Sequence, residues 1–212
     1  MIEPIVIGTG SRGNATLLDC ILIDCGMPSR AILPYFKRIK LVLLTHIHCD
    51  HFKPSTLRRI HSERPSVRFV CGEHLAGELI SLGISPIMID VVSPGQTYDY
   101  GLFEIEPLEL VHNVRNFGYK IRFHTGETAI YATDTNSLDG ISAPNFTWYF
   151  IEANHGEKEI HERIKRKALE NQYAYEYDAA RNHLSREKAD DWLYRMASPN
   201  SLIYYMHEHI EK

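Results

Sequence analysis

The sequence contains no apolar run long enough to span a membrane and no large excess of charge of one sign. It also lacks the basic start that signal peptides share, so we expect a cytoplasmic protein without a membrane anchor. Its formal net charge of -4 argues against a strongly cationic protein that wraps nucleic acid. A nucleic-acid substrate stays open, because bound metal cations and local basic runs can attract phosphate groups.

Cysteine is scarce, and the four cysteines form neither a C-x-x-C pair nor a short disulfide framework. That usage suits a reducing compartment. The sequence also shows no internal repeat, low-complexity segment or linker. A chain of 212 residues that is 44% hydrophobic and 24% charged is long enough to bury a sizeable core. We therefore expect a single globular domain over residues 1–212.

Histidine, by contrast, is abundant: the sequence has 12, and the densest group is Thr-His-Ile-His-Cys-Asp-His at residues 45–51. Apolar residues at 41–44 precede it and are typical of a buried strand. A surface loop that happens to be rich in histidine is the plainer interpretation, but several types of metal ligand rarely coincide at this spacing. Neutral imidazole and carboxylate bind zinc and the neighbouring first-row metals at neutral pH.

The spacing within this segment predicts how its side chains divide between metal ions. His46 and His48 are two residues apart, so in extended backbone their side chains point the same way. Asp50 and His51 follow where the chain turns toward Pro54, a residue that suits the first turn of a helix. Two imidazoles can therefore hold one ion, while the carboxylate and the third imidazole face a second.

Residues 8–14 form a glycine-rich turn that does not fit a phosphate-binding Walker loop, because no Gly-Lys-Ser/Thr follows and no helix begins there. This segment is either a plain tight turn or a rim that brings Ser11, Arg12 and Asn14 to a site. Asp24, at the end of a predicted strand, could accept a hydrogen bond from a metal-binding histidine.

Short strands alternate with helices along the chain. The strands are expected at residues 2–7, 15–18, 21–24, 41–44, 67–71, 87–92, 102–110, 119–123, 129–132, 148–151 and 201–206. The helices are expected at residues 28–39, 54–61, 73–82, 157–171 and 185–196. Ser185 is the expected N-cap of the last helix. This alternation indicates a layered α/β fold.

Three further predicted strands end beside a histidine or an aspartate, at His112, Asp134 and His207. Strand ends on a rigid scaffold can place ligands accurately. Together with the four donor side chains at residues 46–51 they make seven groups, which suits two ions about 3.5–4 Å apart with one bridging carboxylate. His209 points the same way as His207 in an extended chain and is an alternative last ligand.

The H-x-H-x-D-H pattern at residues 46–51 resembles the signature of the metallo-β-lactamase superfamily. Other segments resemble one branch of it, the YycJ/WalJ-type nuclease-like proteins, which are similar in plan to tRNase Z and RNase J. Those segments are Gly10-Ser-Arg-Gly-Asn14, Leu22-Ile-Asp24-Cys-Gly26, Gly118-Tyr119, Thr133-Asp-Thr135, Glu152-Ala-Asn-His155 and His183-Leu-Ser185. They occur in the family's order from about residue 6 to residue 207, which is nearly the whole chain.

This resemblance implies an αββα sandwich of the metallo-β-lactamase fold and two divalent metal ions, either zinc or manganese. The implied ligands are His46, His48 and His112 for the first ion, and Asp50, His51 and His207 for the second. Asp134 would bridge the two ions, with a water or hydroxide between them.

The same resemblance implies a two-metal phosphodiesterase or nuclease that acts on nucleic acid or on a small phosphodiester. Two cations make hydroxide available at neutral pH, and Asp50 would orient it. His183 would protonate the leaving alkoxide, since the family's corresponding histidine lies at the site without binding metal. Glu152 or His155 would orient His183.

The chain departs from the family pattern at several positions. Cys49 stands where a small polar residue is usual, and we expect a packed thiol rather than a metal ligand. Asn182 precedes His183 where the family tends to have glycine, and Met-His-Glu-His at 206–209 replaces His-Leu-Ser. The sequence also has no inserted domain or long arm that could grip an RNA. The family's chemistry therefore carries over better than its substrate.

Other functions fit the same metal site. A metal-activated hydroxide attacks carbon as readily as phosphorus, so a hydrolase of lactones, thioesters or β-lactams is one alternative. A small cyclic-nucleotide phosphodiesterase is another, since the chain is compact and modestly acidic. A metal-binding module without enzymatic activity is disfavoured, because no ligand is missing. Tyr173, Tyr175 and Tyr177 could stack on bases, although packing of a connector onto the core is the more ordinary role for such aromatics.

Overall fold

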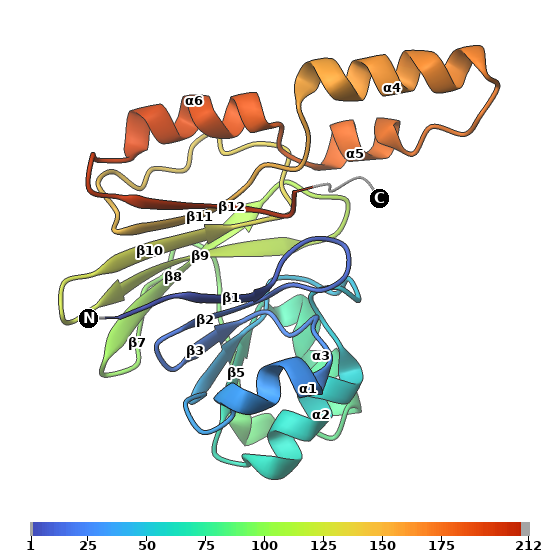
Figure 1. The fold of residues 1–212 in the computed structure, drawn as a ribbon. Helices are drawn as coiled ribbons and strands as arrows, with labels where there is room; N and C mark the ends of the chain where they lie inside the picture. The colour runs from blue at the N-terminus through green and yellow to red at the C-terminus, as the bar shows by residue number, and fades with distance from the viewer. Residues whose placement is uncertain (1, 209–212) are drawn as a thin grey trace. The chain divides into compact units, whose positions relative to one another are not determined.

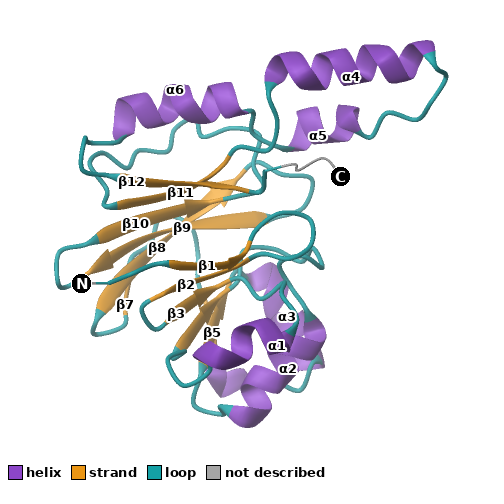
Figure 2. Cartoon of the chain, viewed as in Figure 1, coloured by secondary structure: helices purple, strands orange, loops and turns teal. Residues whose placement is uncertain are grey.

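The computed structural model describes residues 2–208. Their elements fall into two compact units, of which the first ends at Gln96 and the second begins at Thr97. Each unit contains one six-stranded sheet together with its own helices, as Figures 1 and 2 show. No helix within residues 2–208 is both long and apolar enough to cross a membrane. The expectation of one domain over residues 1–212 stays a prediction.

The sheet of the first unit follows chain order. Its strands are β1 (Ile5–Gly8), β2 (Ala15–Leu18), β3 (Ile21–Ile23), β4 (Leu41–Leu43), β5 (Arg68–Cys71) and β6 (Ile89–Val91). Strands β1 to β3 are antiparallel, and the predicted hairpin is confirmed with Leu18 opposite Ile21. From β3 to β6 the strands are parallel. The carboxyl ends of parallel strands share one edge of a sheet, so β4 delivers the histidine-rich segment to that edge.

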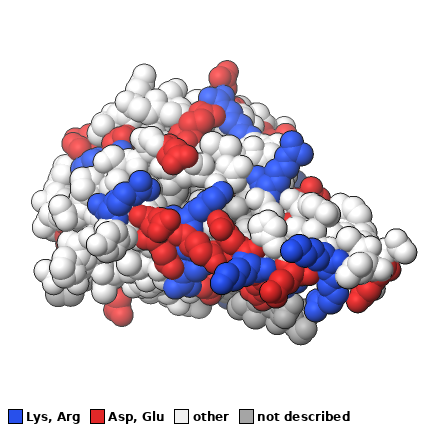
Figure 3. Space-filling view, turned by 90° about the horizontal axis from the view of Figure 1, so that it is seen from above, with Lys and Arg blue, Asp and Glu red and all other residues white. Residues whose placement is uncertain are grey.

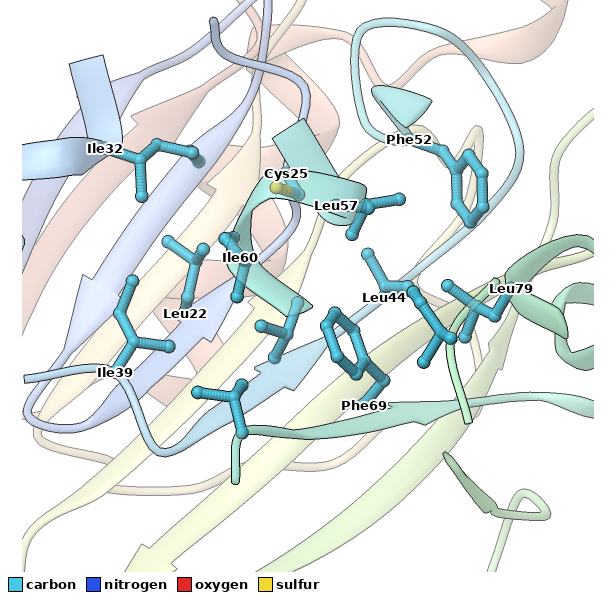
Figure 4. Close-up of a cluster of buried hydrophobic side chains, with 14 of the residues drawn as sticks. Leu22, Cys25, Ile32, Ile39, Leu44, Phe52, Leu57, Ile60, Phe69 and Leu79 are labelled. Atoms are coloured by element: carbon cyan, nitrogen blue, oxygen red, sulfur yellow. The ribbon is translucent and has the colours of Figure 1, made fainter. Parts of the chain in front are cut away.

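The helices of the first unit are α1 (Ser29–Ile32), α2 (Pro54–Glu63) and α3 (Glu73–Ser81), with 3₁₀ turns at Leu33–Tyr35 and Pro86–Met88. Leu57 and Ile60, three residues apart on α2, are buried on one helix face. Figure 4 shows them in one cluster with Leu22, Leu44 and Phe69. This core fixes the helices that follow β3, β4 and β5.

The predicted helix over residues 28–39 is wrong. α1 ends at Ile32 and a single 3₁₀ turn over Leu33–Tyr35 follows. The reason is Pro34, which lacks the N–H that a helix interior needs and clashes with the preceding turn. Proline is tolerated at the start of a new turn, which is where this one lies.

The sheet of the second unit also runs in chain order. Its strands are β7 (Tyr98–Asp99), β8 (Phe103–Leu110), β9 (Asn116–Phe123), β10 (Thr128–Ala132), β11 (Trp148–Glu152) and β12 (Leu202–Met206). β7 to β10 are antiparallel, whereas β10, β11 and β12 are parallel. The predicted alternation along β8 is confirmed, because Phe103 and Ile105 are buried while Glu104 and Glu106 are partly exposed.

The helices of the second unit are α4 (Glu157–Leu169), α5 (Glu176–Asn182) and α6 (Arg186–Met196). α6 packs on β11, and α4 lies beside α5 (Figure 1). The predicted N-cap is confirmed, since the Ser185 hydroxyl accepts a hydrogen bond from the backbone N–H of Lys188 at 3.2 Å. The sequence did not predict α5, because seven residues are too few to show a helical period.

Candidate metal-binding site

Three imidazoles of the first unit converge in the segment that follows β4. His46 and His51 are fully buried, and their ring centroids lie 4.2 Å apart. His46 Nε2 is 3.1 Å from His48 Nδ1. Two nitrogens on one tetrahedral zinc ion lie about 3.3 Å apart when each Zn–N distance is about 2.0–2.1 Å. The geometry of this pair therefore fits a shared ion, and the donor chemistry fits zinc.

Asp24 and Asn14 fix the protonation of His51. Asp24 Oδ2 lies 2.6 Å from His51 Nδ1, and both residues are fully buried. On the other side of the ring, Asn14 Nδ2 lies 2.7 Å from His51 Nε2. The Asn14 side chain is oriented by its Oδ1, which accepts a hydrogen bond from the Gly10 N–H at 2.8 Å. Nδ2 can only donate, so Nε2 is an acceptor and the proton of the neutral ring sits on Nδ1. A metal bound at Nε2 would take this lone pair in place of the Asn14 amide.

The glycine-rich turn divides in two. Asn14 is buried, and its Nδ2 also lies 3.3 Å from Asp50 Oδ2. For this residue the structure agrees with the interpretation of the turn as the rim of a site. Ser11 and Arg12 are exposed. The predicted role of Asp24 in supporting a candidate histidine ligand agrees with its contact to His51. The prediction for Cys49 is wrong, because this thiol is exposed rather than packed.

In the second unit, parallel pairing gathers three strand ends. β10, β11 and β12 pair in parallel, so Asp134, Glu152 and His207 meet at one edge of the sheet. His207 Nε2 lies 3.6 Å from Asp134 Oδ1, and His207 Nδ1 lies 3.5 Å from Glu152 Oε1. With His183, these side chains offer ligand atoms that all lie within 4.8 Å of one another.

Glu152 and His183 form the tightest pair in this group. His183 Nδ1 lies 2.6 Å from Glu152 Oε1, and the other carboxylate oxygen accepts from the backbone N–H of Thr135 at 2.7 Å. Glu152 is fully buried, and burial raises its pKa, an effect that the hydrogen bond from His183 opposes. The His183 ring stacks on His207 with centroids 5.1 Å apart. The predicted candidates Glu152 and His183 are thus brought together.

His112 follows β8 and is partly buried. Its Nδ1 lies 3.2 Å from the carbonyl oxygen of Asn182, so Nδ1 donates and the lone pair of the neutral ring is on Nε2, the atom that would bind a metal. His155 contacts Asn154 and forms a β-bridge with Ser185, and burial lowers its pKa. The sequence predicted that either Glu152 or His155 would orient His183. In the structure the contact to His183 is made by Glu152.

Strained backbone marks the same positions. Asp24, Asp134 and His207 all have positive φ, between 55° and 59°, which is uncommon for residues other than glycine. Asn116 supports the turn at Asp134, since its Nδ2 donates to the carbonyl oxygens of Thr133 at 2.9 Å and Asp134 at 2.7 Å. Asn116 could not be predicted from the sequence, because nothing in its own neighbourhood signals a contact 18 residues away.

Asn154 supports His207 in the same manner, and its Nδ2 donates to the His207 carbonyl oxygen at 2.9 Å. Asn154 belongs to the Glu-Ala-Asn-His segment, so the family pattern contained this signal. The alternative ligand His209 lies outside the described residues.

Comparisons with known proteins agree with this fold. The model of the β-lactamase superfamily domain matches residues 19–161, and the chain belongs to this superfamily. The metallo-β-lactamase fold protein YhfI from Bacillus subtilis is 17% identical with a TM-score of 0.77, over 100% of this chain and 88% of that one. Human short-form tRNase Z is 16% identical with a TM-score of 0.72, over 98% of this chain and 92% of that one. A diphosphatase of the PhnP family is 14% identical with a TM-score of 0.67, over 98% of this chain and 87% of that one. None of the curated proteins matches the chain.

These matches confirm the predicted superfamily and its α/β fold class. Together with the clustered imidazoles and carboxylates, they support a metal-dependent hydrolase that binds divalent ions.

Proposed function

We propose that this protein is a two-metal phosphodiesterase, most simply a nuclease, with zinc or manganese held by the seven ligands that the family resemblance implies. The observation that carries the proposal is the 2.6 Å contact between buried Glu152 and partly buried His183, beside the candidate ligands Asp134 and His207. The metal pair, when bound, supplies a hydroxide at neutral pH and offsets charge that develops on phosphorus.

His183 provides the proton that an alkoxide leaving group needs. Glu152 accepts from Nδ1 of His183, which orients the ring so that Nε2 faces away from the carboxylate. In the first unit, Asp50 is partly exposed, with Oδ2 within 3.7 Å of His51 Nε2, so its carboxylate is placed to orient the attacking oxygen. Placement in the YycJ/WalJ-type branch and action in the cytoplasm are part of the same proposal.

The structurally similar proteins support phosphate chemistry over carbonyl chemistry. Two of them are named as a tRNase Z and a diphosphatase. The metal site alone does not separate the two reactions, because a hydroxide attacks either centre. Nucleic acid is the proposed substrate, and the small cyclic phosphodiesters and carbonyl esters are the competitors in the test below.

The test is hydrolysis by the metal-loaded protein and by His183→Ala. The panel contains end-labelled single- and double-stranded DNA, RNA, a cyclic dinucleotide, an aryl phosphodiester, a lactone and a cephalosporin. We expect phosphodiester cleavage by the wild type and a fall of at least about 100-fold in the variant, which is the lower end for general acid catalysis. Metal content, measured on the same samples, should be unchanged.

His124→Ala is the matched control, since this histidine side chain is half exposed at a hairpin end of the same unit. It should keep wild-type activity. Turnover of the lactone or cephalosporin alone would overturn the phosphodiesterase proposal while leaving the fold assignment intact. Equal activity of His183→Ala and the wild type on every phosphodiester would remove His183 from the mechanism.

A further inference from the structure

A polar hollow of about 630 Å³ opens on the second unit next to His112. Its lining is mostly polar, with Val111 as the apolar member, and the polar residues are His112, Asn113, Asn136, Asp178, Arg181 and Asn182. Most of them come from the last turn of α5 and from the segments after β8 and β10. A hollow of this size and polarity beside a candidate metal ligand is suited to a polar part of the substrate.

Two hydrogen bonds fix the end of α5 against these segments. The Asn136 side chain donates to the carbonyl oxygen of Arg181 at 2.8 Å. The carbonyl oxygen of Asn182 accepts from Nδ1 of His112 at 3.2 Å. The backbone that carries the Arg181 side chain is therefore held at a fixed distance from His112, which is what a positioning element for substrate requires.

Arg181 and Tyr177 offer their side chains to solvent. Arg181 is exposed and forms no ion pair with any residue between 2 and 208. Tyr177 precedes it by one helical turn on the same face of α5 and is 59% exposed. The one acidic group of the hollow, Asp178, accepts a hydrogen bond from the Tyr173 hydroxyl at 3.2 Å. The Arg181 guanidinium, which can bind a phosphate, and the Tyr177 ring, which can stack on a base, therefore lie one helical turn apart on α5.

We infer that Tyr177 and Arg181 form a nucleotide subsite that receives a single strand of nucleic acid flanking the scissile phosphate. This inference rests on the proposed phosphodiesterase function and names its substrate class. Arginine binds phosphate through its planar fork of donors, and exposed aromatic rings stack on bases of any sequence. Figure 3 shows acidic and basic side chains mixed on the face that carries α4 and α6, so affinity depends on placed groups rather than on a broad cationic surface.

The three tyrosines between α4 and α6 were expected to pack a connector onto the core, and their exposure contradicts this. Tyr173, Tyr175 and Tyr177 are 80%, 45% and 59% exposed, so they do not pack a connector onto the core. Tyr175 is engaged by the Lys167 ammonium, which lies 3.9 Å from its ring centroid. Tyr177 makes no ring contact with any residue between 2 and 208 and is the tyrosine available for a base.

The experiment measures equilibrium binding of a fluorescent, hydrolysis-resistant phosphorothioate single strand of about eight nucleotides to the metal-loaded protein. Tyr177→Ala and Arg181→Ala are each expected to raise Kd about ten-fold, and the double variant more. The control is the double variant Tyr194→Ala, Arg195→Ala on α6, which removes the same two residue types from exposed positions outside the hollow. It should change Kd less than two-fold, and melting temperatures should match throughout.

Hydrolysis of a one-phosphate aryl phosphodiester separates this inference from the proposed function. The aryl substrate does not reach the subsite, so the α5 double variant should hydrolyse it at the wild-type rate. Wild-type Kd in the α5 double variant, or an equal loss in the α6 control, would overturn the subsite even if the aryl phosphodiester is cleaved. Selective loss of strand binding in a protein that cleaves no phosphodiester would support the subsite and sink the proposed reaction. A Kd change for a cyclic dinucleotide but not for the strand would reject the single strand as its occupant.

Discussion

The Asp24 carboxylate accepts a hydrogen bond from Nδ1 of His51 at 2.6 Å, and neither side chain is exposed to solvent. Asp24 also accepts from the backbone N–H of Thr45 at 3.0 Å and from its hydroxyl at 2.9 Å. One buried carboxylate thus orients a candidate ligand and the segment that carries His46. Carboxylate partners of this kind hold a metal-binding imidazole in the correct tautomer and raise its basicity.

Replacing Asp24 by asparagine should weaken metal binding. Asn keeps the shape and tolerates the left-handed backbone at this position, where φ is 59°, but it removes the charge. We expect zinc affinity to fall at least about ten-fold, measured by competition with a chromogenic chelator. Asp19→Asn is the control, because Asp19 also has positive φ, at 52°. Unchanged zinc affinity in Asp24→Asn would show that the His51 contact plays no part in metal binding.

Gly26→Ala should disturb the histidine segment through the backbone. A Cβ at Gly26 would lie 1.7 Å from the carbonyl oxygen of Asp50, so the segment must move. We expect loss of zinc and a lower melting temperature. Gly77→Ala in α3 is the opposite case, since nothing lies within 4 Å of its Cβ, and it should stabilise the protein by about 0.5–1 kcal/mol. A Gly26→Ala protein with native zinc content would contradict the predicted collision.

Glu106→Gln should change how the free energy of unfolding depends on pH. Burial of Glu106 would raise its pKa, but Lys120 at 2.9 Å and Arg122 at 3.3 Å together hold it below the ordinary value of 4.5. A carboxyl with a depressed folded pKa stabilises the protein above its unfolded pKa, and this contribution disappears as pH falls through the folded pKa. The wild type should therefore lose more unfolding free energy than Glu106→Gln between pH 7 and about pH 3.

Denaturant titrations at each pH measure this difference. Glu78→Gln is the control, because Glu78 is an exposed residue of α3. If the wild type instead became more stable relative to Glu106→Gln as pH falls, the difference in unfolding free energy would have the wrong sign for the ion pairs between β8 and β9.

Ile60→Ala should destabilise the first unit by about 2–5 kcal/mol, because it removes a side chain that is 1% exposed within the core shown in Figure 4. Ile80→Ala removes the same atoms from α3 at a position that is 49% exposed, and should cost less than about 0.5 kcal/mol. Chemical denaturation of both variants measures the contrast. Equal losses would mean that Ile60 does not contribute to the core as described.

The sequence alone determined features whose causes are local. Apolar runs and alternation located eleven of the twelve strands between residues 2 and 208 in advance, and the short β7 was missed because two residues show no period. The Ser185 cap joins a side-chain hydroxyl to a backbone N–H three residues later, so it was visible as well. The ligand types at residues 45–51 and at three strand ends were read directly, because chemistry that belongs to a residue type does not depend on the fold.

Only the tertiary structure decided which groups touch. The Glu152–His183 pair joins residues 31 apart in sequence, and the Asp24–His51 pair joins residues 27 apart. In each pair the carboxylate stands at a strand end, of β3 or β11, and the histidine comes from a segment outside the strands that packs against that end. The parallel register of the neighbouring strands sets where those ends lie. Local patterns do not encode that register. They also did not reveal the exposure of Cys49 or the position of Arg181 in a polar hollow, since both depend on how neighbouring segments pack.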